Sequence, residues 1–274
     1  MGLFDKLREL LTGQTGKGAS KPVAAEPAPA AMTPAASSVD NEQAFEETLR
    51  RRHEYWAGVG EVEDDVLTHL ISPTFTGGPA WPSTRQAFRI VRRPHGIVLA
   101  TDGLSDPFDG VAGAGNGFEL ELFVETADID PDLAGAAGDV GGLSKSWAFE
   151  LLNQVAGTIA GAGGISGQLA RYKVLSMEIP GVSRSYAIAA QLPPGFTTDD
   201  DSVGVLIGAP EPDFPTRIDD TPLSPVTIVP LVLLRAEELQ QLRQGGAEAR
   251  QALAARLAAS PTRHRSSLTR PALI

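Results

Sequence analysis

Two glutamates in the middle of the chain are spaced as paired catalytic carboxylates could be. Glu119 and Glu121 lie two residues apart in a segment that alternates polar and apolar side chains. On a β-strand this spacing puts both carboxylates on one face, about 7 Å apart. That separation falls within the range of glycosidase carboxylate pairs. The solvated face of an antiparallel strand gives the same pattern, and we favour that interpretation.

An acidic run further along resembles part of a calcium-binding loop. Asp128, Asp130 and Asp132 alternate, and Asp139 follows eleven residues after the first. Leu133 stands where the turning glycine belongs, and a predicted strand precedes the run instead of a helix. With four histidines and no cysteine, the chain also offers little for zinc. We therefore predict neither metal nor cofactor, and interpret His95 as a loop histidine.

The elements that must position these residues mix strands and helices without regular βαβ alternation. This favours an α+β fold, with a mixed, largely antiparallel sheet packed with helices in a single domain. The predicted strands are 86–92, 96–101, 118–125, 171–179, 185–191, 203–208 and 226–234. Predicted helices start near Asp40 and at a Ser144 cap, and 237–244 and 247–257 form a pair broken at Gly245-Gly246.

Composition divides the chain into four parts. Residues 1–13 predict an amphipathic helix, and residues 14–38 an Ala/Pro/Gly-rich linker. Residues 39–260 form the domain, and residues 261–274 a basic flexible tail. The helix needs a surface to lie on, which could belong to its own domain, to a partner or to a membrane. We favour protein over membrane contact for residues 1–12.

The domain is strongly acidic. Residues 39–260 hold 16 basic and 31 acidic side chains, a net charge of −15. Such a domain repels nucleic-acid phosphates, so we expect no nucleic-acid partner. The charge serves solubility, or it steers the domain onto a basic protein. The absence of cysteine, of a long apolar run and of a leader pattern predicts a cytoplasmic protein.

Four ordered segments over residues 40–258 resemble the Suppressor of fused domain family. The first two are Thr101-Asp-Gly-Leu-Ser-Asp106-Pro-Phe-Asp109 and Gly115-Asn-Gly-Phe-Glu-Leu-Glu-Leu-Phe-Val-Glu125. The third is a Trp-containing helix at 146–156, and the fourth is a closing strand with Glu-Glu-Leu at 226–239. The resemblance implies a non-enzymatic protein-binding domain. Bacterial single-domain relatives look like immunity proteins that neutralise a toxin.

An immunity role gives the acidic charge a use, because an acidic surface would steer onto a basic toxin. The residues expected to form this partner-binding surface are Asp102, Asp106, Glu119, Glu121, Glu125, Asp199, Asp200 and Asp201. Two alternatives stay open. One is a hydrolase or metal-dependent enzyme whose site gathers only in three dimensions. The other is a scaffold tethered through residues 1–12.

Overall fold

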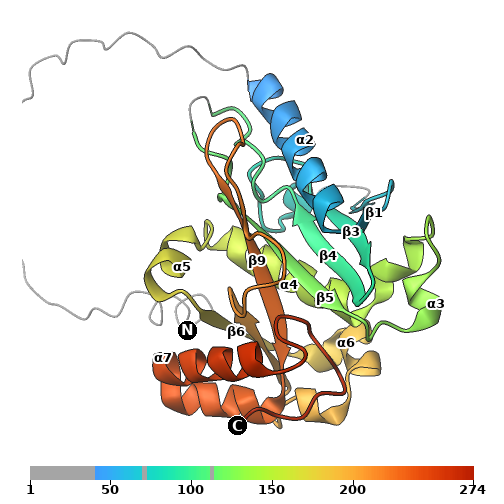
Figure 1. Cartoon of the computed structure of the whole chain (residues 1–274), viewed down its shortest axis with the longest axis vertical. Coiled ribbons are helices and arrows are strands. Elements are labelled where there is room, and N and C mark those ends of the chain that lie inside the picture. The colour runs from blue at the N-terminus through green and yellow to red at the C-terminus, as the bar shows by residue number, and fades with distance from the viewer. Residues whose placement is uncertain (1–40, 70–72, 112–113) are drawn as a thin grey trace, which may run out of the picture. The chain divides into compact units, whose positions relative to one another are not determined.

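Apolar runs of the chain build one nine-stranded sheet (Figure 1). The computed structural model describes residues 41–69, 73–111 and 114–274, so the predicted helix at 1–13 and linker at 14–38 lie outside the described residues. The strands are β1 (Glu61–Val62), β2 (Leu67–Thr68), β3 (Ala87–Arg93), β4 (Gly96–Asp102), β5 (Leu120–Thr126), β6 (Leu175–Pro180), β7 (Ser202–Ile207), β8 (Arg217–Ile218) and β9 (Val226–Leu234). Their order is β1-β3-β4-β5-β9-β7-β6, with β2 beside β3 and β8 beside β9.

β9 is the central strand and joins two antiparallel parts of the sheet. Its first half pairs parallel with β5, with Leu120 opposite Thr227, and its second half pairs antiparallel with β7. Pro230 marks the transition, where the proline cannot donate a ladder hydrogen bond. Its carbonyl accepts one from the Gly208 backbone N–H at 3.0 Å. The predicted α+β class with a mixed, largely antiparallel sheet is confirmed.

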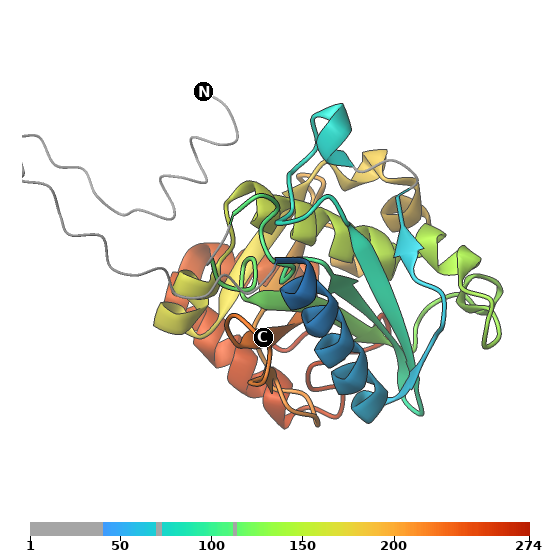
Figure 2. The ribbon, with the colours of Figure 1, turned by 90° about the horizontal axis from the view of Figure 1, so that it is seen from above.

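Helices cover both faces of the sheet (Figure 2). They are α2 (Asn41–Val59), α3 (Pro131–Ala134), α4 (Trp147–Gly161), α5 (Ser166–Tyr172), α6 (Tyr186–Gln191) and α7 (Ala236–Ala259). Alternate residues of β9 show which helix covers which face. Leu231 and Leu233 join the core built on α4, whereas Ile228 packs with Trp56 of α2 and Val232 with the apolar side of α7. α4 therefore lies on one face, and α2 and α7 share the other.

Most predicted strands are confirmed to within two residues, but two segments differ. Residues 185–191 form α6 because the Ser185 hydroxyl caps the Ile188 backbone N–H at 3.2 Å. Residues 171–179 begin in α5 and become β6 only at Leu175. The cap of α4 is Ser146 rather than Ser144, since the Ser146 hydroxyl accepts from the Phe149 N–H.

The end of the chain differs from the predicted flexible tail. The described residues belong to one compact unit, and His264, Ser266 and Arg270 are buried in it. Arg270 donates to both oxygens of Glu238, at 2.5 and 2.6 Å. Arg270 therefore neutralises a buried acid of the domain, whereas Arg263 and Arg265 donate to backbone carbonyls. The predicted break in α7 is confirmed, because Gly246 has non-helical torsion angles within that helix.

No helix among the described residues combines the length and the apolar character needed to cross a membrane.

Candidate functional site

The polar face of β5 is covered, although its alternation predicted exposure. Glu121 and Glu125 have no exposed surface, and every residue of β5 is buried. α2 lies over Glu121, and the segment around His264 lies over Glu125. The expectation that these two carboxylates face a partner is wrong for this structure. Alternation shows only that a strand has two faces, and a helix distant in sequence covers the second one.

Three predicted partner-binding residues instead surround one buried arginine. We call Arg52 with Asp102, Asp106 and Glu121 the Arg52 cluster. The guanidinium nitrogens of Arg52 lie 2.9 Å from Asp102, 2.5 Å from Asp106 and 3.2 Å from Glu121. All four side chains are at most 1% exposed. Asp102 and Asp106 are therefore also not part of the predicted partner-binding surface. They can be buried because each carboxylate is paired with an arginine, which offsets the loss of solvation.

Glu121 fixes the loop that follows β4. Its carboxylate accepts hydrogen bonds from the backbone N–H groups of Gly103 and Ser105, at 3.0 and 2.9 Å, and from the hydroxyls of Thr101 and Ser105. A carboxylate with this many donors acts as an anchor, because every lone pair already has a partner. The Gly-Leu-Ser stretch therefore has a structural explanation within this chain.

Asp102 is held ionised by three cations. Arg85 and Arg89 lie 2.7 and 2.6 Å from its carboxylate, on the side away from Arg52. Burial alone would raise the pKa of Asp102, but the three arginines outweigh burial and hold it well below its ordinary value. With Arg85 and Arg89 counted beside Arg52, three guanidinium groups face the three carboxylates of the cluster, and their charges balance.

A second group of charges surrounds Glu125, and we call Glu125, Arg93, Asp213 and His264 the Glu125 cluster. Arg93 donates to Glu125 at 2.7 Å and to Asp213 at 3.0 Å. The His264 Nε2 lies 2.7 Å from the same glutamate. Burial favours the neutral form of Asp213, but its bonds to Arg93 prevail and lower the pKa of Asp213. Asp213 is half exposed, so this cluster reaches the surface.

The Glu125 cluster contains residue types that bind metal ions. Glu125, Asp213 and His264 offer ligand atoms that all lie within 4.8 Å of one another, at a cavity of about 140 Å³. His95 and two further arginines also line this cavity. Arg93 already neutralises both carboxylates, so a divalent cation would have to displace its guanidinium. The present geometry suits an internal ion pair better than a metal centre.

The predicted residues that remain exposed or partly exposed do not lie together. Glu119 comes just before β5 and has a positive φ of 58°, so it does not share a face with Glu121. Asp199, Asp200 and Asp201 come before β7. β5 starts beside the start of β9, and β7 starts beside its end. The nine residues of β9 span about 26 Å, so these carboxylates lie at opposite ends of the sheet.

Part of the exposed group is also paired. Arg243 lies 2.9 Å from Asp200 and 2.6 Å from Glu178. Hydrogen bonds from Thr198 and Arg243 lower the pKa of Asp200. Asp201 accepts from the Ser183 hydroxyl at 2.7 Å. These contacts fix the turn before β7, as expected for a structural turn.

A different set of carboxylates gathers beside β1 and α3, which are neighbours in Figures 1 and 2. Glu63 and Arg92 form a partly buried pair that binds the loop after α3: Glu63 accepts from the Gly138 N–H, and Arg92 donates to the Ala136 carbonyl. Exposed acids flank this junction on β1, on α3 and on the loops that follow them. We call them the acidic corner: Glu61, Asp64, Asp65, Asp132 and Asp139.

The acidic corner differs from the other exposed acids in its pairing. Within the described ranges, no hydrogen bond or ion pair engages the carboxylates of Glu61, Asp64, Asp65 or Asp139. A shallow cavity of about 520 Å³ lies beside them, and its lining includes Asp65 and Asp139 together with other polar and apolar residues. In the sequence, only the Glu-Val-Glu-Asp-Asp run at 61–65 indicates an acidic surface here. The loop that meets it could not be located from the sequence.

Two of the four aspartates that resembled a calcium loop, Asp128 and Asp130, have structural roles, whereas Asp132 and Asp139 belong to the acidic corner. Asp128 accepts from the Leu268 backbone N–H at 2.7 Å, which attaches the C-terminal segment to the end of β5. Asp130 caps α3 by accepting from the Asp132 N–H at 2.9 Å. Asp128 therefore holds the C-terminal segment and Asp130 holds the start of α3.

No protein-family model matches this chain, and a search of curated proteins finds no significant relative.

Proposed function

We propose that the protein is a non-enzymatic binding domain whose acidic corner engages a basic protein. The observation that carries this proposal is the gathering of unpaired, exposed carboxylates where the loops after β1 and α3 meet. Charge complementarity of this kind increases association rates and selects partners. The resemblance to the Suppressor of fused family suggests the setting, an immunity-type protein that neutralises a basic toxin in the cytoplasm.

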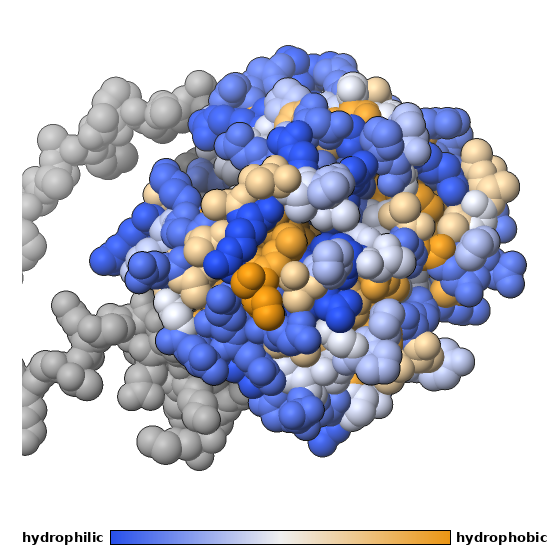
Figure 3. Space-filling view, turned by 60° about the horizontal axis from the view of Figure 1, so that its bottom comes forward, coloured by the Kyte–Doolittle hydropathy of each residue, from blue (hydrophilic) through white to orange (hydrophobic). Residues whose placement is uncertain are grey.

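The distribution of charge over the domain supports a surface role for its acids. Exposed acidic side chains outnumber exposed lysines and arginines by about two to one among the described residues. Several arginines are instead buried in internal ion pairs, among them Arg52, Arg89 and Arg270. Figure 3 shows one face of the molecule, on which hydrophilic side chains surround a small apolar patch. Each of these arginines is paired with a buried carboxylate, so none of them neutralises the acids that remain exposed.

The test begins with recovery of the partner. The full chain is used to capture proteins from its host at low and moderate salt, and captured proteins are identified by mass spectrometry. Association with the purified partner is then compared for the native chain and for the triple variant Asp64→Lys, Asp65→Lys, Asp139→Lys. We expect association at low salt to slow by about tenfold or more.

The matched control carries the same change of net charge elsewhere. Glu46, Glu237 and Glu248 are also exposed, on α2 and α7, and all three are replaced by lysine. If the control slows association as much as the acidic-corner variant does, only the total charge matters and the location is wrong. Reversal of Glu121 or Glu125 is unsuitable, because each is buried against an arginine.

A metal-dependent enzyme remains a second candidate, favoured by the grouping of Glu125, Asp213 and His264. Titration of the protein with Zn²⁺ or Mn²⁺, followed by calorimetry, tests it directly. Stoichiometric binding that is lost in His264→Gln would support a metal site, which this candidate requires, and absence of binding would leave the cluster as an internal ion pair.

A further inference from the structure

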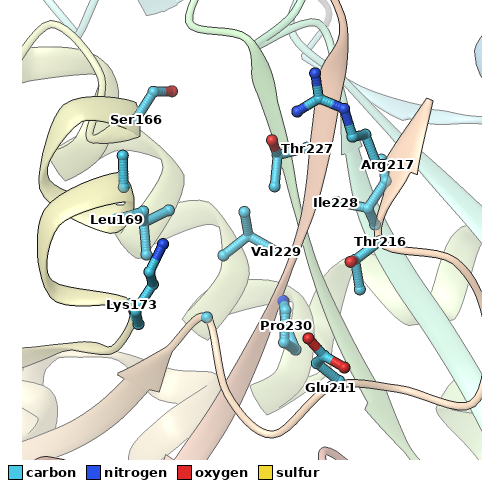
Figure 4. A pocket seen from close by; sticks show the side chains of 12 residues that line it. Ser166, Leu169, Lys173, Glu211, Thr216, Arg217, Thr227, Ile228, Val229 and Pro230 are labelled. Carbon is cyan, nitrogen blue, oxygen red and sulfur yellow. The ribbon is translucent and has the colours of Figure 1, made fainter. Parts of the chain in front are cut away.

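A cavity between α5 and the first half of β9 lies apart from both ion clusters and from the acidic corner (Figure 4). Its volume is about 300 Å³, at the lower end of the range for small-molecule sites. It exists because β9 changes neighbours at Pro230. β7 pairs only with the second half of β9, and the loop that follows β7 passes beside the first half.

The lining combines an apolar wall with a few polar groups that point inward. Leu169 of α5 faces Val229 and Pro230 of β9 across the cavity (Figure 4). The hydroxyls of Thr216 and Thr227 lie on the strand side. An apolar body with one polar end would satisfy such a lining, because buried polar groups need partners while the wall does not.

Two cations approach the cavity from opposite sides. Figure 4 shows the Lys173 side chain extending from the end of α5 and the Arg217 guanidinium beside Thr227. No hydrogen bond or ion pair engages the Lys173 side chain within the described part of the chain. Arg217 uses only its Nε, which lies 2.5 Å from Asp219. Both side chains therefore keep donors available.

The one carboxylate in the lining lies apart from the arginine. Glu211 approaches from the loop after β7, beside Pro230, and its side chain lies at the other end of the cavity from Arg217 (Figure 4). An anionic group is therefore favoured near Lys173, Thr227 and Arg217 and disfavoured near Glu211. This polarity gives a ligand one orientation.

We propose that this cavity binds a small organic monoanion, a carboxylate with a short apolar chain. The carboxylate accepts from Lys173, Thr227 and Arg217, and the chain lies between Leu169 and Val229. This site is independent of the proposed binding of a basic protein, and the experiment below tests it separately.

Hexanoate is the probe, with hexylamine and hexanol as ligands of equal chain length and different charge. Binding to the full chain is followed by backbone amide shifts in NMR spectra. We expect hexanoate to bind with a dissociation constant on the order of 1 mM. The shifts should centre on residues 169–173 and 227–229. Hexylamine and hexanol should bind at least about tenfold more weakly, because neither carries a negative charge that can pair with the two cations.

Two variants separate the charge from the cavity. Lys173→Met nearly keeps the length of the side chain but removes its charge, so the binding of hexanoate should weaken about tenfold. Since Lys173 already has a positive φ of 66°, methionine adds no new backbone strain. Ala170→Trp, at the exposed rim, should block the cavity, whereas Arg171→Trp, next to it on α5 and outside the lining, should leave binding unchanged.

A third variant tests the orientation. Glu211→Gln removes the repulsive charge and should tighten hexanoate about two- to threefold. The proposal is overturned if hexanoate does not bind at a concentration ten times the expected dissociation constant. It is also overturned if hexylamine binds as tightly as hexanoate does. Equal binding by Lys173→Met or by Ala170→Trp would also overturn it, because the first removes a cation that the proposal requires and the second fills the space that the ligand would occupy.

Discussion

The Arg52 cluster and the Glu125 cluster lie on the same face of β5, yet they are built differently. In the Arg52 cluster, Arg52 of α2 and the three carboxylates that it contacts are all buried. In the Glu125 cluster, one buried carboxylate is shared by an arginine and a histidine, and the half-exposed Asp213 connects it to solvent. The first attaches a helix to the sheet, and the second attaches the C-terminal segment.

The difference shows how one polar stripe on a strand serves two purposes. A fully buried charge depends entirely on its partners, because no water can replace a lost one. A charge near the surface can recover part of its solvation. We therefore expect the same kind of substitution to be costly at Arg52 and milder at the Glu125 cluster.

The largest effect is expected for Arg52→Met, which leaves three buried carboxylates without their shared cation. The free energy of unfolding should fall by about 3–5 kcal/mol, measured by urea denaturation. Arg50→Met is the control, because Arg50 lies on the same helix and its ion pairs with Glu47 and Glu54 are exposed. A loss below about 1 kcal/mol for Arg52→Met would remove the distinction between the clusters.

The next effect concerns pH. The pKa of Asp102 is lowered in the folded state, so the unfolded chain takes up a proton first as the pH falls. Its contribution is complete above the ordinary pKa near 3.8 and is lost as the pH falls toward the folded value. Asp102→Asn should therefore cost about 2–3 kcal/mol at neutral pH and progressively less below about pH 4.

Urea denaturation of the native chain and of Asp102→Asn, over a series of pH values, measures this difference. Asp199→Asn serves as control, since Asp199 is exposed in the turn before β7. A cost for Asp102→Asn that stays constant with pH would mean that Asp102 does not carry the expected charge.

At the Glu125 cluster we expect a smaller loss. His264→Phe keeps the ring contacts with Phe123 and Phe214 and removes the bond to Glu125, while Arg93 continues to neutralise the carboxylate. The free energy of unfolding should fall by about 1–2 kcal/mol. His264→Gln retains a donor and should recover part of it. A loss as large as that of Arg52→Met would show that the two clusters are equally dependent on their partners.

The smallest effect is expected outside both clusters. Arg243→Gln removes exposed ion pairs with Glu178 and Asp200 and should change the free energy of unfolding by no more than about 1 kcal/mol. Added salt should reduce even this difference, because exposed pairs are screened. A larger, salt-independent cost would mean that the turn before β7 depends on Arg243 as the clusters depend on their arginines.

The positions of the strands could be predicted from the sequence, but which side chains on them are buried could not. The continuous apolar run of β9 and the alternation of β5 identified both strands, because period and length are local properties. The same alternation suggested that Glu121 and Glu125 are exposed. Their burial depends on Arg52 and His264, which lie far from β5 along the chain. Charge patterning shows that acids occur, but only the fold shows which of them a cation covers.

The error at residues 185–191 has a local cause. Ile188 and its neighbours have the apolar character of a strand, but the Ser185 hydroxyl caps a helix at that point. A single capping bond can decide between a short strand and a short helix. The acidic corner lay beyond prediction for another reason, since it forms where two loops meet through Glu63 and Arg92.

The pairing of β5 with β9 has a consequence for the order of folding. Leu120 of β5 pairs with Thr227 of β9, which is about one hundred residues later in the chain. By contrast, β3 pairs with β4, and β4 with β5, which are near neighbours in sequence. The edges of β5 and β7 therefore stay open until β9 arrives between them, and open edges invite aggregation. Contacts this distant along the chain form slowly. β9 is thus expected to set the pace of folding, and a chain halted before Val226 would expose the two edges that the complete protein hides.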